Sequence, residues 1–147
     1  MASDLQWAVF NRLTDLHVGA YKLSGGRIGS RVPWGENGSM LLLEHVGAKS
    51  GKHRTIPLLY IDDGEDVVIV ASKGGSHKHP AWFHNLMANP ATRVQIGSEK
   101  RDVVARKASK REKKRLWPRV VDIWPSYESY QARTKREIPL VILSPRD

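Results

Sequence analysis

A short cation-rich segment offers the clearest chemistry in this chain. Residues 46–55 read VGAKSGKHRT and place two glycines, three cations, a serine and a threonine between apolar runs. Backbone amides and nearby cations can together form a concave donor site for an anion, and Lys49, Ser50 and Arg54 are the candidate ligands. The spacing argues against a nucleotide P-loop, which needs four residues between its glycines and a Ser or Thr after the Lys. The segment therefore indicates either an anion-binding turn or a charged surface hairpin.

Two further groups could do chemistry. The three histidines of HKHPAWFH (residues 77–84) have no acid close by, so we expect them to be solvated or hydrogen-bonded rather than bound to a metal. WPSYESYQ gathers Trp124, Tyr127 and Tyr130 after a proline break. One helical turn would bring the two tyrosines to the same side. This group indicates either core packing or the wall of a pocket.

The sequence contains no recognisable catalytic triad. Ser72 and Ser76 have histidines nearby but no nucleophile elbow, and no paired carboxylates occur at a catalytic spacing. The chain has no cysteine, which excludes thiolate metal sites, cysteine nucleophiles and disulfides. If the chain is an enzyme, a bound cofactor must carry the chemistry.

Length and charge limit the classes of function. The 147 residues correspond to about one domain, and the net charge of +9 favours an anionic partner. Residues 100–115 hold nine cations and two acids, a run that we expect to be a solvated strand end and helix face. No apolar run approaches the ~20 residues that a membrane span needs, and no signal peptide is visible, so we expect a cytoplasmic protein.

The elements that must position these groups are short. Residues 3–23 are amphipathic at helical spacing, and a loop rich in glycine follows to residue 39. We expect this first helix to dock on the core of the protein. Trp7 and Phe10 leave a peripheral contact with the inner face of the cell membrane as the alternative.

The rest of the chain predicts strands and three helical segments. Strands are expected at residues 40–46, 54–61, 66–71, 92–97, 101–107 and 138–144. Pro57 predicts an edge or a bulge, since proline donates no ladder hydrogen bond. Helices are expected between Pro80 and Pro90, with Trp82, Phe83 and Leu86 turned inward, and from a Ser109–Glu112 capping box to about Ile123. A short helical turn follows Pro125.

The strands are too closely spaced for parallel crossover connections. The order therefore predicts an α+β, mainly β fold, in which an antiparallel sheet curls into a small barrel with helices outside. We expect one domain over residues 1–147, made of an N-terminal helix and loop (1–39) and the barrel (40–147).

Four segments resemble the deazaflavin-dependent nitroreductases of mycobacteria and their relatives. They are HVGAKSGKHRTIPLLY, VVIVASKGGSHKHPAWFHNLMANP, VQIG and WPSYESYQARTKREIPLVIL, in the order and spacing of that family. The match spans roughly residues 40–144. It implies a split β-barrel, related to flavin-binding oxidases, that uses reduced coenzyme F-420. This coenzyme is a deazaflavin with a phosphodiester and a tail of glutamates.

The resemblance also implies sites. Its cofactor-binding residues would be Ala48, Lys49, Ser50, Arg54, Thr55, Ile56, Pro57, Leu58, Leu59, Val70, Ala71, Ser72, Lys73, Ala81, Trp82, Phe83, His84, Asn85 and Tyr127. Tyr130, Tyr127 and Ser72 would be catalytic, and Trp124, Tyr127 and Tyr130 would face the substrate. Many relatives have Tyr where this chain has Trp124, so the substrate preference is not carried over. No metal is expected.

The implied reaction is hydride transfer from reduced coenzyme F-420 to a quinone, an activated enone or a nitroaromatic compound. An F-420-reducing dehydrogenase would resupply the cofactor. One alternative is a barrel that binds ordinary flavin mononucleotide. The other is a non-enzymatic basic barrel on nucleic acid or a membrane surface. The aromatic residues lie mainly at helix positions rather than on strands, so we do not expect nucleic acid to be a partner.

Overall fold

The computed structural model describes residues 14–22 and 39–146. Residues 14–22 are helical, in agreement with the later part of the expected N-terminal helix. The expected start of that helix, including Trp7 and Phe10, lies outside the described residues, as does nearly all of the expected glycine-rich loop. None of the described helices is both long enough and apolar enough to span a bilayer.

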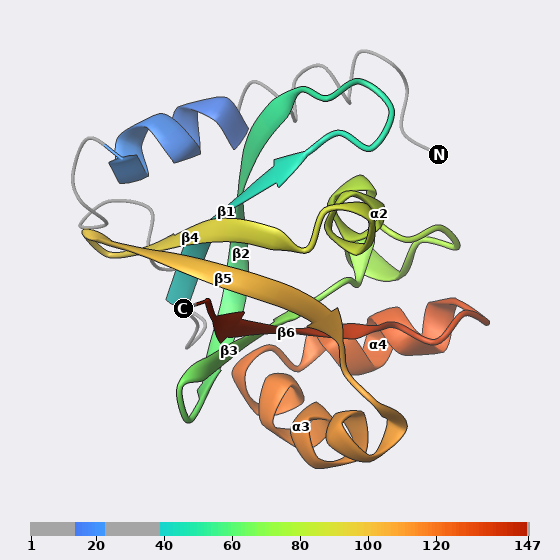
Figure 1. Cartoon of the computed structure of the whole chain (residues 1–147). Coiled ribbons are helices and arrows are strands. Elements are labelled where there is room, and N and C mark those ends of the chain that lie inside the picture. Colours follow the sequence, from blue (N-terminus) through green and yellow to red (C-terminus); the bar gives the residue numbers. More distant parts are fainter. Residues whose placement is uncertain (1–13, 23–38, 147) are drawn as a thin grey trace.

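Six strands form a closed antiparallel barrel (Figure 1). Its elements are β1 (Ser39–Val46), β2 (His53–Asp63), β3 (Asp66–Val70), η1 (Lys73–Gly75), α2 (Ala81–Ala88), β4 (Ala91–Ile96), β5 (Glu99–Lys107), α3 (Lys110–Ile123), α4 (Ser126–Arg133) and β6 (Leu140–Pro145). The strands pair in the order β1-β2-β3-β6-β5-β4. The barrel and all six strands confirm the prediction. The short turn expected after Pro125 is a helix of eight residues, α4, and the 3-10 turn η1 was not predicted.

Local sequence signals explain where these elements begin and turn. Ser109 accepts a hydrogen bond from the Glu112 amide, and the Glu112 side chain accepts one from the Ser109 amide, so the expected capping box is present at α3. Gly64 turns the β2–β3 hairpin with φ of 65°, a left-handed conformation that glycine adopts without a steric penalty.

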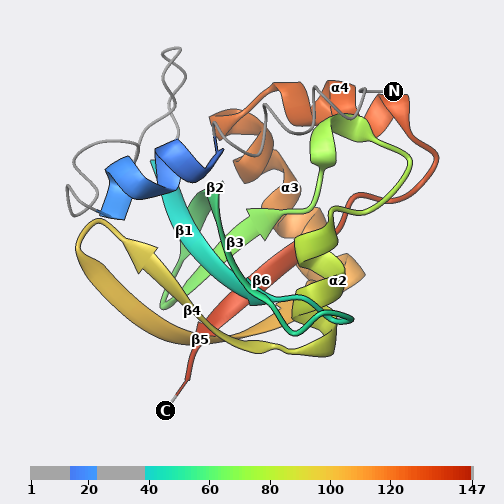
Figure 2. The ribbon, with the colours of Figure 1, turned by 90° about the horizontal axis from the view of Figure 1, so that it is seen from above.

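Alternation along the strands creates two large apolar cores, and a third, small cluster packs Val18 and Tyr21 against Leu42 of β1. One side of each strand faces the barrel interior, where Trp82, Phe83 and Leu86 of α2 pack against residues such as Leu43 and Ile69. Burial of these α2 residues confirms the predicted inward face. The other side of β3 and β6 packs against α3 and α4, which lie together on one side of the barrel (Figure 1). Figure 2 shows α2 beside the strand ends, and Figure 1 shows α2 and α3 on opposite sides of β5 and β6.

Although the barrel is closed, most of β2 is paired on one side only, and we call its other side the open edge of β2. From His53 to Tyr60, β2 pairs with β1, whereas its pairing with β3 starts only at Ile61. Pro57 lies in the singly paired stretch, opposite Leu42, which confirms the expected edge position. This gap between the first part of β2 and the end of β3 leaves room for a ligand.

Candidate functional site

A cleft of 1150 Å³ follows the open edge of β2. Residues from β2, the β3–α2 connection, the start of α2 and the helix at residues 14–22 form its walls. The predicted cofactor residues that line it are Arg54, Thr55, Ile56, Pro57, Leu58, Val70, Ser72, Lys73, Ala81 and Trp82. The fold therefore brings together three predicted segments that are separate in the sequence.

The β1–β2 connection at one side of the cleft is a tight, cation-rich turn. We call residues 47–54 the cation turn. The Gly51 amide donates to the Gly47 carbonyl at 2.8 Å, and the Gly47 amide donates to the Lys52 carbonyl at 2.9 Å. Lys49 and Ser50 are exposed on this turn. Among the described residues, Lys49, Lys52 and Arg54 form no salt bridge, so their charge is available to an anion.

A buried polar pair fixes the cation turn from below. Asn85 of α2 accepts a hydrogen bond from the Ala48 amide at 2.9 Å, and its amide nitrogen lies 3.0 Å from Nδ1 of His45. Burial, with a smaller contribution from the Arg54 charge, lowers the pKa of His45 to about 4. His45 is therefore neutral at pH 7 and can accept from Asn85. Sequence reasoning did not single out His45, because a lone histidine in a strand carries no motif.

The opposite wall is the connection from β3 to α2. Ser72, Lys73 and Gly74 line the cleft there. Lys73 has a φ of 45°, which is uncommon for a residue other than glycine. The side chain of Arg136 hydrogen-bonds to the backbone of this connection. Arg136 was quoted in a matched segment but was not predicted as a site residue.

Several predicted residues lie near the cleft without lining it. Ala48, Lys49 and Ser50 belong to the exposed cation turn, and Asn85 is buried beneath it. Ala71 and Phe83 are buried in the barrel interior. His84 is exposed on α2, and Leu59 lines a small crevice that it shares with Tyr127.

The three predicted substrate-facing aromatics belong to the second core. Tyr127 is buried, with its ring centroid 6.0 Å from that of Tyr130. Burial raises the pKa of Tyr127, so its hydroxyl stays protonated at pH 7. Trp124 donates through Nε1 to the Tyr130 hydroxyl at 3.4 Å. Tyr130 is only half-buried and packs against Gly75 of η1, which connects α4 to the cleft wall.

The described residues contain no group of three side chains arranged to hold a metal ion. The rings of His79 and His84 are 5.7 Å apart, centroid to centroid, and His79 has Nδ1 3.0 Å from the Arg136 guanidinium. A guanidinium can only donate, so His79 accepts through Nδ1. This agrees with the expectation of hydrogen-bonded histidines, at least for His79.

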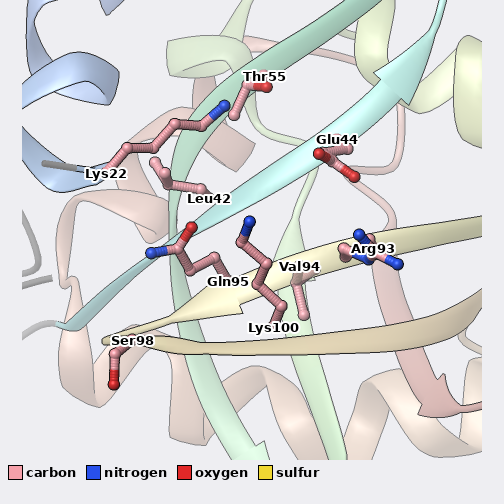
Figure 3. A pocket seen from close by; sticks show the side chains of 9 residues that line it. All are labelled: Lys22, Leu42, Glu44, Thr55, Arg93, Val94, Gln95, Ser98 and Lys100. Atoms are coloured by element: carbon pink, nitrogen blue, oxygen red, sulfur yellow. The ribbon is translucent and has the colours of Figure 1, made fainter. Parts of the chain in front are cut away.

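A second, smaller pocket lies on the outer face of β1 and β4 (Figure 3). Its volume is 310 Å³, and it includes Lys22, Glu44, Arg93 and Lys100. Arg93 is paired with Asp102 at 3.0 Å. The pocket meets the larger cleft at Thr55, which lines both. It has no aromatic wall, so the larger cleft is the better candidate for a flat ring.

Comparison with known sequences finds relatives that are named for the same activity. The sequence profile described as F-420H2-dependent quinone reductase matches residues 13–145. An F-420H2-dependent quinone reductase of Mycobacterium tuberculosis is 40% identical over 138 residues, which cover 92% of this chain and 91% of the relative. A second protein of that organism, assigned provisionally to the same activity, is 51% identical over 106 residues, or 72% of this chain and 89% of the relative.

Solved structures agree with the sequence relatives. An F-420H2-dependent reductase is similar with a TM-score of 0.66 and 40% identity, covering 71% of this chain and 93% of that one. A domain-swapped dimer is similar with a TM-score of 0.70 and 32% identity, covering 97% of this chain and all of that one. A pyridoxamine 5'-phosphate oxidase-like protein of Listeria innocua, at 16% identity and a TM-score of 0.53, shares the fold alone.

Proposed function

This chain belongs to the F-420H2-dependent quinone reductase family, and from that membership we propose how its cleft performs the reaction. The protein is an oxidoreductase that transfers a hydride from reduced coenzyme F-420 to a quinone. The observation that carries the proposed placement of the coenzyme is the cation turn, whose Lys49, Lys52 and Arg54 form no salt bridge among the described residues and lie beside a 1150 Å³ cleft.

The cleft and its charges fit an anionic molecule with a flat ring. The volume exceeds the ~300–1000 Å³ of an ordinary small-molecule pocket, so a coenzyme and a substrate can share it. The cation turn would hold the phosphodiester and steer the acidic tail, with each exposed cation–carboxylate contact contributing ~0.2–1 kcal/mol. Ile56, Leu58 and Val70 would pack against the ring. Ala81 and Trp82 would close the cleft from the side of α2.

The remaining proposed cofactor residues would act from behind these walls. Asn85 would fix the Ala48 amide of the cation turn through its hydrogen bond. Ala71 and Phe83 would support the walls from the barrel interior, and Leu59 and His84 would flank them. Together these contacts would hold two molecules in reacting geometry, which is the main task of a protein whose cofactor carries the chemistry.

Hydroxyl groups in and near the cleft would stabilise the negative charge that develops on the substrate. When bound, the reduced coenzyme supplies the hydride. The quinone then also takes up one proton and becomes a hydroquinone. Ser72 lines the cleft, and the backbone of Tyr130 lies against Gly75 beside the cleft wall. The buried Tyr127 lines a crevice that meets the cleft at Val70. We propose that a hydroxyl of this group hydrogen-bonds the substrate oxygen as it becomes negative, and that one of them, or water, supplies the proton. Trp124 would complete the aromatic wall against the substrate.

The same chemistry extends to other electrophiles and partners. Activated enones and nitroaromatic compounds accept a hydride in the same way, so we propose them as further substrates. An F-420-reducing dehydrogenase would resupply the coenzyme. We place the protein in the cytoplasm. Leu16, 71% exposed on the helix at residues 14–22, supports a peripheral membrane contact where a lipophilic quinone resides.

An assay with reduced coenzyme F-420 and a simple quinone tests this function. The full chain should oxidise the reduced coenzyme only when quinone is present, as followed by the fluorescence of the oxidised coenzyme. Reduced flavin mononucleotide in place of the deazaflavin is the matched control and should support much slower turnover. Oxidation that is independent of quinone, or faster with the flavin, would contradict the proposal.

A further inference from the structure

One side chain outside the predicted site makes four hydrogen bonds to the β3–α2 connection, which forms one wall of the cleft. Arg136 donates through Nη2 to the Ser72 carbonyl at 2.7 Å, through Nη1 to the Ala71 carbonyl at 3.2 Å and through Nε to the Ser76 carbonyl at 2.8 Å. Nη1 also lies 3.0 Å from Nδ1 of His79. One guanidinium therefore donates to four acceptors that are spread over the whole β3–α2 connection.

The connection that Arg136 holds has an unusual backbone. Lys73, Gly74 and Gly75 have φ values of 45°, 62° and 81°, all in the left-handed region. A side chain at Gly75 would place its Cβ 2.7 Å from the Tyr130 carbonyl oxygen, so the connection is also packed closely against α4. Lys73 pays a steric penalty for its conformation that glycine would not, and such residues persist where the surroundings fix them. Arg136 contributes to fixing this one through the carbonyl of Ser72, which also accepts from the Gly75 amide at 3.0 Å.

The orientation of the peptide groups follows from these bonds. The described backbone has no cis peptide bond, so each N–H points opposite to the preceding carbonyl. Because the Ala71 and Ser72 carbonyls point to Arg136, the Ser72 and Lys73 amides point away from it. Ser72 and Lys73 both line the cleft. The guanidinium therefore sets the direction of the peptide dipoles in one wall of the cleft.

Arg136 holds the connection without a carboxylate partner. It takes part in none of the salt bridges within the described part of the chain, and its acceptors are three carbonyls and a histidine nitrogen. Lysine could not replace it, because one ammonium cannot reach four acceptors that a planar fork reaches together.

We propose that Arg136 is a positioning residue that holds the Ser72–Gly74 wall in the shape that binds the coenzyme. This inference rests on the proposed placement of coenzyme F-420 in the cleft. Arg136 does not line the cleft and acts through the backbone of Ser72 and Lys73. Its loss should therefore weaken binding of the coenzyme more than binding of the quinone.

Binding of oxidised coenzyme F-420 to the full chain, followed by fluorescence, tests the proposal with two variants and one control. Arg136→Lys keeps the charge and should raise the coenzyme Kd by about fivefold or more. At saturating coenzyme, its KM for the quinone should stay within about twofold of the native value. His79→Leu removes one acceptor, leaves Arg136 in place and should raise the coenzyme Kd by about two- to threefold. Arg115→Lys, which changes a paired arginine on α3, is the control and should leave the coenzyme Kd unchanged.

The outcomes separate this inference from the proposed function. If the native chain binds no coenzyme, the proposed function fails and takes the inference with it. If the native chain binds and the folded Arg136→Lys variant binds equally well, only the role of Arg136 is overturned. Should Arg136→Lys not fold, an unchanged Kd in His79→Leu overturns that role in the same way. An equal rise in coenzyme Kd and quinone KM would show a general structural role and would also overturn it.

Discussion

Two basic regions of this protein use their charge in opposite ways. Along α3 and β5, arginines are neutralised within the fold: Arg115 and Arg119 both pair with Asp63, and Arg106 pairs with Glu112. In the cation turn, Lys49, Lys52 and Arg54 have no such partner among the described residues. The more densely charged region thus has part of its charge paired within the fold, and none of its residues lines the 1150 Å³ cleft, whereas Arg54 of the less dense region does.

Unpaired charge beside a cleft, rather than charge density, therefore marks the candidate binding site. A carboxylate partner cancels most of the positive electrostatic potential of a cation. Cations grouped without such partners attract an anion and raise its association rate. The fold reinforces this division. Asp63 ends β2 on the side of α3, far along the strand from Arg54 near its start.

The largest expected effect comes from reversing charge in the cation turn. The double substitution Lys49→Glu and Arg54→Glu should raise the coenzyme Kd by about thirtyfold or more, because two attractive contacts become repulsive. Fluorescence titration with coenzyme F-420 measures the change. The same double reversal at Lys110 and Lys114 of α3 is the matched control, and an equal loss of affinity there would break the comparison between the two regions.

The two regions should also respond to acid in different pH ranges. The pKa of His45 is about 4 in the fold against an ordinary value of 6.5, so the unfolded chain takes up this proton first as the pH falls. The contribution of His45 is complete above pH 6.5 and is lost towards pH 4, which should lower the free energy of unfolding by roughly 1–2 kcal/mol between pH 7 and 5. Urea unfolding of the native chain and of His45→Gln at both pH values measures it. A native pH dependence equal to that of the variant would contradict the assignment.

The ion pairs of α3 should withstand the same acidification. Arg106 and the Ser109 amide lower the pKa of Glu112 to about 2, and Arg115 with Arg119 lowers the pKa of Asp63 below its usual value. Carboxylates with lowered pKa values contribute stability at neutral pH and lose it only in stronger acid. Acid unfolding at pH 5 should therefore begin at the cation turn rather than at α3, and hydrogen exchange at pH 5 and 7 would show the order.

Removing the shared acid of the paired region should affect stability alone. Asp63→Asn leaves Arg115 and Arg119 without their ion pair and should lower the free energy of unfolding by about 1 kcal/mol, as measured with urea. The coenzyme Kd should not change. A clear change in affinity would show that the two regions are coupled.

The smallest expected effect concerns Tyr130, whose side chain packs against the second core and whose backbone lies against Gly75, next to the cleft-lining Gly74. Tyr130→Phe should lower turnover on a quinone by more than about threefold, since a hydroxyl that stabilises developing charge is lost. The rate at saturating coenzyme measures it. Tyr127→Phe is the comparison, because Tyr127 is more deeply buried. Unchanged turnover in Tyr130→Phe would remove that residue from the mechanism.

The barrel could be predicted from the sequence because each strand and turn carries a local signal. The alternating apolar residues of β5, the Asp-Gly turn at Gly64 and the Ser109 capping box all act over a few residues, and the structure has each of them. Pro57 also predicted the open edge of β2, along which the cleft lies. Family resemblance then supplied the three separate segments that line it.

The residues that support the site could not be predicted in the same way. His45 and Arg136 reach their partners from 40 and about 60 residues away in the chain, respectively. No local pattern records such contacts, since they depend on how β1, α2 and the segment before β6 come together in the fold. The same holds for the charges: only the folded structure shows which cations meet an acid.

A titration of the native chain with oxidised coenzyme F-420 at low and at high ionic strength tests the central claim most directly. Saturable binding that weakens as salt is added is the predicted result, because the unpaired cations of the turn attract an acidic ligand across exposed surface. Absence of binding at low ionic strength, or binding that salt does not weaken, would contradict the claim that the cation turn anchors the coenzyme.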